Sequence, residues 1–136
     1  MDIAVNYVAV LLAAIASYAV GALWHSPVGF GKQWMHMMGL TAEKMRAMPL
    51  TATQAMIIGF FVTLLVAFVF ALFKGLVGAE TISLSLQLGF WVWLGFLAPT
   101  LANSWLWEGK SFKLLAFNAA YQLVSIEVIA LVLALM

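Results

Sequence analysis

Four apolar stretches of this sequence are each long enough to cross a lipid bilayer, and they leave little chain for anything else. A transmembrane helix needs about 20 predominantly apolar residues. The four stretches cover about residues 3–24, 53–73, 82–107 and 112–135 of a chain of 136 residues. Because backbone polar groups must be paired inside hydrocarbon, spans of this kind are helical. We therefore expect an all-α fold: a polytopic membrane protein in which residues 1–136 form a single domain, a bundle of four transmembrane helices.

Composition excludes several other classes of protein. Only 8% of the residues are charged, whereas a soluble domain is about a quarter charged, so the lipid bilayer is the expected partner. The sequence has no cysteine, which excludes disulfides and thiolate metal ligands. A basic run that would indicate nucleic-acid binding is missing, and so are the catalytic motifs HExxH, GxSxG and a glycine-rich phosphate loop. We expect no nucleic-acid partner, no enzymatic activity and no cofactor.

The longest connection, between the first and second spans, is expected to lie at the membrane surface. Ser26 and Pro27 end the first helix, because a residue before proline disfavours the helical conformation. The interfacial segment covers about residues 30–48, where Trp34 and several methionines suit the headgroup boundary. Thr41 is a candidate cap of a second short helix there. His25 and His36, with the neighbouring methionines, could hold Cu(I), but their spacing defines no coordination geometry, so no metal site is predicted.

Basic residues predict the orientation of the chain in the membrane. Five of the six lie in the first and third connections, and only Lys74 lies on the other side. The five are Lys32, Lys44, Arg46, Lys110 and Lys113. Loops rich in lysine and arginine stay in the cytoplasm. We therefore expect a multi-pass protein of the cell (plasma or inner) membrane, with both termini outside and the first and third connections cytoplasmic.

Small residues recur at every fourth position of the first two spans. Such ridges allow close approach of membrane helices. They predict that the first and second spans pack together, or that one ridge forms a seam between copies of the chain. Two ridges exceed the need of one bundle, so we expect a homo-oligomer, most simply a dimer. The ridges are Ala9, Ala13, Ser17 and Gly21, followed by Gly59, Thr63, Ala67, Ala71 and Gly75.

Polar side chains form one stripe on the third span and one on the fourth. In a helix, residues three and four apart share a face, and a stripe facing lipid would leave polar groups unpaired. The two stripes are therefore expected to face each other, at matching depth, beside a kink at Pro99. The surface on which the two stripes meet, here called the polar seam, is either a site for a small solute or ion or a set of polar contacts between helices. Its members are Thr100, Asn103, Asn118, Tyr121 and Gln122.

Glu127 is an acid inside or near the edge of the hydrocarbon, on a different face of the fourth span from the stripe. An intramembrane carboxyl is costly and by default indicates function. Three interpretations stay open: a neutral acid hydrogen-bonded to a neighbouring helix, a proton-relay group, or a carboxylate that reaches the outer surface.

Several stretches together carry a family resemblance. They are residues 6–10, the segment Gly21 to Pro27 with Phe30-Gly31-Lys32 and Trp34, residues 95–100, residues 108–110 and the segment Asn118 to Leu123. The chain resembles the domain of unknown function 1761 family, which are small four-span membrane proteins. The resemblance implies no named activity. It places Trp24, His25, Ser26, Pro27, Lys32 and Trp34 in an interfacial signature, and Pro99, Thr100, Asn118, Tyr121 and Gln122 in other signature stretches.

Three functions are compatible with these observations. The first is a channel- or transporter-like protein for a small solute or ion that uses the polar seam. The second is a non-transporting scaffold or accessory subunit that binds a membrane partner or lipid through the small-residue ridges. The third is a membrane protein that binds a metal or a redox cofactor.

Overall fold

A computed structural model describes residues 3–136, and every regular element in that range is a helix. Four helical segments are long and apolar enough to span a membrane, which confirms the expected fold class. The elements in chain order are α1 (Tyr7–Trp24), α2 (Gly31–Met38), α3 (Ala42–Arg46), α4 (Ala52–Val77), α5 (Ile82–Val92), η1 (Trp93–Leu97), α6 (Ala98–Leu106) and α7 (Phe112–Leu135).

Local capping sets where the helices begin and end. The Asn6 side chain accepts a hydrogen bond from the Ala9 amide at 3.1 Å, so the first span begins at Tyr7 rather than near residue 3. Thr41 caps α3 as expected, and Thr51 caps α4 in a reciprocal pair with Gln54. Side-chain oxygens at these positions satisfy amides that have no partner within the helix. Helix α4 continues past residue 73, because a left-handed glycine that ends a helix, Gly78 with φ 71°, comes only after Val77.

The third span is interrupted at the expected place. Between α5 and α6 lies the π-helix η1, in which the Ala98 amide donates to the Trp93 carbonyl. Pro99 follows directly, at the start of α6, and its missing amide proton removes one ordinary helical hydrogen bond. The irregularity expected at Pro99 therefore takes the form of a wider helical turn just before it.

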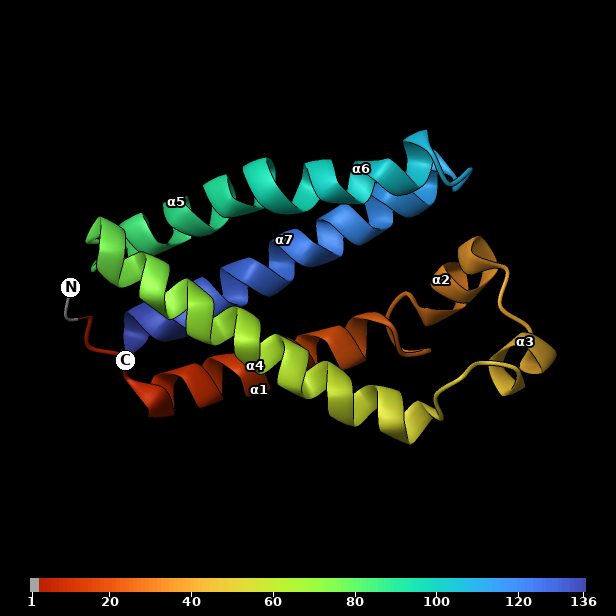
Figure 1. Cartoon of the computed structure of the whole chain (residues 1–136), viewed down its shortest axis with the longest axis horizontal. Helices are drawn as coiled ribbons and strands as arrows, with labels where there is room; N and C mark the ends of the chain where they lie inside the picture. The colour runs from red at the N-terminus through yellow and green to blue at the C-terminus, as the bar shows by residue number, and fades with distance from the viewer. Residues whose placement is uncertain (1–2) are drawn as a thin grey trace.

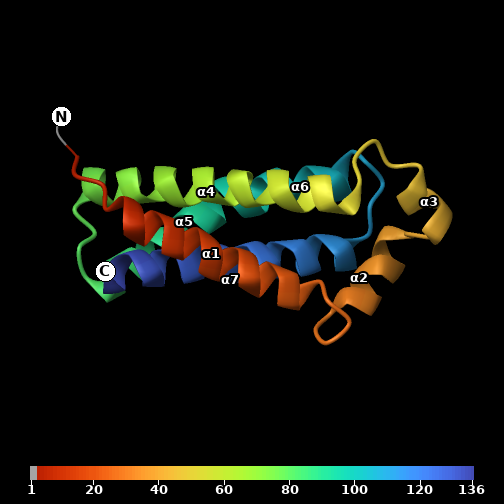
Figure 2. The ribbon, with the colours of Figure 1, turned by 90° about the horizontal axis from the view of Figure 1, so that it is seen from below.

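Helix α7 is the centre of the bundle. It packs against α1 on one side and against α5 and α6 on another, while α4 packs mainly against α1 (Figure 1). From the turn that joins them, α4 and the α5–α6 span diverge (Figure 1). The start of α1 and the end of α7 lie at one end of the bundle, and α2 and α3 lie at the other (Figure 2). The segment after the first span, which was expected at the membrane surface, thus contains two short helices.

The first small-residue ridge packs fully inside the chain, and the second packs there in part. All four residues of the first ridge are buried. Ser17 Oγ lies 2.7 Å from Ser125 Oγ of α7, and Gly21 lies against the Tyr121 ring. On α4, Gly59 faces the Tyr18 ring of α1. The expected packing of the first two spans is confirmed, and the first ridge also serves α7. On the second ridge, Ala67 is buried and Gly75 is exposed.

Candidate functional site

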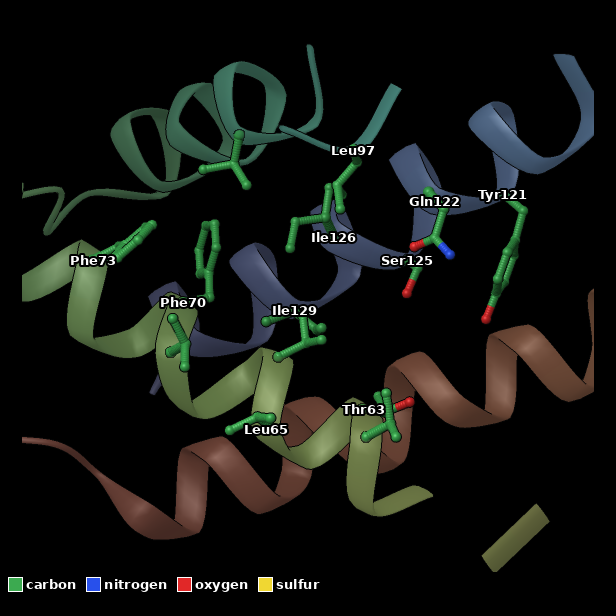
Figure 3. A pocket seen from close by; sticks show the side chains of 14 residues that line it. Thr63, Leu65, Phe70, Phe73, Leu97, Tyr121, Gln122, Ser125, Ile126 and Ile129 are labelled. Carbon is green, nitrogen blue, oxygen red and sulfur yellow. The ribbon is translucent and has the colours of Figure 1, made fainter. Parts of the chain in front are cut away.

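A groove of about 340 Å³ lies between α4, the α5–η1 segment and α7. It opens where α4 and α5–α6 diverge, and Figure 3 shows its side chains converging from three elements. Its walls are mainly apolar. The lining residues are Val62, Thr63, Leu65, Val66, Val69, Phe70, Phe73, Val92, Leu97, Tyr121, Gln122, Ser125, Ile126 and Ile129.

One end of the groove is polar. Thr63, Tyr121, Gln122 and Ser125 gather there, whereas Phe73 marks the apolar end (Figure 3). Two hydroxyls are already engaged: Thr63 donates to the Gly59 carbonyl at 3.0 Å, and Ser125 pairs with Ser17. Among residues 3–136, no hydrogen bond to the Gln122 carboxamide is found. Gln122 thus offers a donor and an acceptor to whatever occupies the polar end.

The groove was not predicted from the sequence, although two of its polar residues were. Tyr121 and Gln122 belong to the predicted seam, but Thr63 was noted only as a member of a packing ridge. The signal that could have identified Thr63 is its depth: it lies eleven residues into α4, about 16 Å at 1.5 Å per residue. Gln122 lies ten residues into α7, about 15 Å by the same measure, so both lie near the middle of their helices.

A second, smaller cavity of about 210 Å³ lies on the other side of Tyr121. It is bounded by Tyr18, Gly21 and His25 of the α1 region and by Met56 of α4. The Tyr121 ring lines both cavities. Its position is held by neighbouring rings, with the His25 centroid at 4.8 Å and the Trp24 centroid at 5.9 Å. Tyr121 is therefore the partition between the groove and the smaller cavity.

The predicted seam between the third and fourth spans is not assembled as expected. Thr100 is exposed and donates to the Phe96 carbonyl of its own turn at 2.6 Å, and Asn103 is exposed as well. Asn118 is half-buried. Tyr121 faces α1, so the expected pairing of Thr100 with Tyr121 is wrong. The reason is that α7 has neighbours on several sides, and its polar stripe is turned toward α1 and α4. Trp93 supplies a polar contact from the third span, donating to the Ala119 carbonyl at 2.7 Å.

The residues of the interfacial signature end α1 and start the surface segment. His25 Nδ1 lies 2.9 Å from the Gly21 carbonyl, and the His25 ring packs against Trp34 at 5.1 Å. Ser26 donates to the Leu23 carbonyl at 2.8 Å. Pro27 and Lys32 are exposed.

The Trp24 ring packs against Phe30 and Phe117, and its Nε1 is buried with no partner in the described part of the chain. This arrangement is a packed aromatic cluster at the end of the bundle.

Glu127 lies at the contact between α7 and α5. Its Oε1 atom rests against Gly89, whose missing side chain leaves room for the carboxyl. That oxygen is buried and has no hydrogen-bond partner within residues 3–136. The hydrogen bond to a neighbouring helix that one interpretation requires is therefore not found for Oε1. Glu127 thus faces α5, whereas Tyr121 of the stripe lies against His25 at the end of α1.

Replacing Glu127 with methionine is expected to raise the free energy of unfolding by about 1 kcal/mol, because it removes a buried oxygen without a partner and keeps the volume. The measurement is unfolding in a denaturing detergent, followed by circular dichroism. Glu127→Gln, which keeps a polar end, serves as the control and is expected to change little. A loss of stability in Glu127→Met would show that the carboxyl makes a favourable interaction.

Comparison with known proteins agrees with the resemblance seen in the sequence. No curated protein and no solved structure was found to match the chain. One family model does match, and it extends over residues 8–134, from the first turn of α1 to the last turn of α7. Because that match covers nearly the whole chain, the protein belongs to the family described as "Protein of unknown function (DUF1761)".

Proposed function

We propose that this membrane protein binds an uncharged, lipid-soluble molecule in the groove between α4, η1 and α7. The observation that supports the proposal is the distribution of side chains along that groove: apolar walls with one polar end near the middle of α4 and α7. A volume of about 340 Å³ is within the usual range of small-molecule sites. The opening between two diverging spans lets a ligand enter from the lipid.

The chemistry of the polar end defines the ligand class. Gln122 can donate and accept one hydrogen bond at the same time, and no charged side chain lines the groove. A charged ligand would be costly to hold at this depth. The groove therefore suits an apolar body that carries one or two carbonyl or hydroxyl groups, as in a quinone or a long-chain isoprenoid alcohol.

The proposal is tested with decylubiquinone and the full-length chain in lipid nanodiscs. The bound quinone quenches the tryptophan fluorescence of the chain, so titration yields a dissociation constant. Gln122→Leu is expected to weaken binding about tenfold, the equivalent of one hydrogen bond in a dry site. Val66→Phe, which fills the groove, is expected to abolish binding.

Asn103→Leu is the matched control, because it removes an exposed amide from the neighbouring α6. Its affinity is expected to equal that of the unmodified chain. Equal quenching in all four proteins would mean that the quinone reports only its concentration in the lipid, and the groove would then not be a binding site.

A second candidate is movement of a small solute or ion across the membrane, as the sequence analysis considered. The observation that favours it is the Tyr121 ring, which separates the groove from the smaller cavity near α1. Transport would require this ring, which His25 and Trp24 hold in place, to rotate so that the two spaces join. Solute flux into liposomes distinguishes the candidates: a binding protein shows no flux above empty liposomes, whereas a transporter does.

A further inference from the structure

Lys74 is buried near the end of α4. Only 8% of its surface is exposed, and it is the one charged residue among the buried residues of the described range. Its Nζ atom donates to the Ala79 carbonyl at 2.5 Å. An ammonium group has three donors, so this bond uses one of them. No acidic side chain of residues 3–136 forms an ion pair with Lys74, and burying an ammonium without a counter-charge is costly.

A polar cavity of about 360 Å³ lies beside Lys74. It is formed where α1 begins and where α4 and α7 end, at one end of the bundle (Figure 1). Asn6 and Glu80 line it together with Lys74. The Asn6 oxygen is engaged in capping α1, so the NH₂ group of its amide stays available as a donor.

We infer that this cavity binds the head group of a phospholipid, with the phosphate at Lys74 and Asn6. A phosphate oxygen supplies the counter-charge that no acidic side chain of residues 3–136 provides to Lys74 in an ion pair, and charge-assisted hydrogen bonds to phosphate are strong. The exposed Glu80 carboxylate on the same cavity suits a primary amine, so the favoured occupant is a phosphatidylethanolamine. The position at the end of a transmembrane helix places the cavity at the depth of lipid head groups.

This site is independent of the proposed ligand groove. The two share no lining residue, and the groove ligand is uncharged whereas the cavity binds a phosphate. Failure of one assignment leaves the other unaffected.

The test is native mass spectrometry of the full-length chain in detergent with an equimolar mixture of phosphatidylethanolamine and phosphatidylglycerol. The unmodified chain is expected to retain phosphatidylethanolamine in preference. Lys74→Gln is expected to reduce retention of both lipids about tenfold, and Glu80→Gln is expected to remove the preference between them. Lys110→Gln, at an exposed lysine in the α6–α7 turn, is the matched control and should retain lipid as the unmodified chain does.

Two further measurements complete the test: one identifies the source of the anion, and the other examines the carboxylate of Asp2. Inorganic phosphate at a large excess is expected not to displace the lipid, and displacement would assign the cavity to free phosphate instead. Asp2→Asn removes the carboxylate at a residue outside the described range and is expected to leave lipid retention unchanged. A gain or a loss in that variant, or equal retention by Lys74→Gln and the unmodified chain, would overturn the proposal. If Lys74→Gln fails to fold, Lys74→Arg and Glu80→Gln decide: the first must retain lipid and the second must lose the preference.

Discussion

Replacement of Ser17 by leucine is expected to lower the free energy of unfolding by about 3 kcal/mol, at the upper end of what overpacking usually costs. Ser17 has no exposed surface and lies where α1 crosses α7, with its hydroxyl 2.7 Å from that of Ser125. Membrane helices approach closely only where side chains are small. A leucine at this position has no space, so it must push α1 away from α7 and disturb the centre of the bundle.

Two variants on the same helix separate the loss of space from the loss of the hydrogen bond. Ser17→Ala removes only the hydroxyl and is expected to cost about 0.6 kcal/mol, the average for a polar contact between membrane helices. Ala19→Leu adds similar bulk at an exposed position and is expected to be neutral. The measurement is unfolding in denaturing detergent. If Ser17→Leu and Ala19→Leu unfold at the same detergent fraction, α1 does not pack on α7 through Ser17.

Replacement of Gly21 by alanine is expected to destabilise the chain by about 2 kcal/mol, a typical overpacking cost. A Cβ atom at Gly21 would collide with the hydroxyl oxygen of Tyr121, while the ring carbons that follow lie at 3.3 and 3.4 Å. The tyrosine ring is not free to move away, because His25 and Trp24 pack against it. The added methyl group therefore collides with a single atom, the hydroxyl oxygen, of a side chain that its neighbours hold in place.

A second substitution is expected to rescue that variant. Tyr121→Phe removes the hydroxyl oxygen, so the double variant Gly21→Ala/Tyr121→Phe is expected to recover most of the lost stability. Gly95→Ala is the matched control, because a Cβ atom there meets nothing within 4 Å. Thermal unfolding in nanodiscs of the two single variants, the double variant and the control completes a double-mutant cycle. Additive losses in the double variant would show that Gly21 and Tyr121 do not touch.

The local features of the fold were predictable from the sequence because they depend on neighbouring residues. The lengths of the four spans follow from bilayer thickness. Thr41 was identified as a cap because its hydroxyl reaches an amide only three residues ahead, at Lys44. Pro99 marked an interruption because it has no amide proton, wherever the rest of the chain lies. The ridge that contains Ser17 was recognised as a packing surface from its spacing alone.

The partners of each helix face were decided only by the tertiary structure. Helical periodicity fixes the direction in which a side chain points around the axis of its helix. In a bundle of four helices, however, more than one neighbouring helix can lie in that direction. For this reason Tyr121 was expected to face the third span and instead lies against α1, while Thr100 is exposed. The groove arises from the divergence of α4 and α5–α6, and the burial of Lys74 from three chain segments meeting at one end. The groove and the burial of Lys74 both depend on how closely segments far apart in the sequence approach each other. A local pattern of residues does not determine that approach.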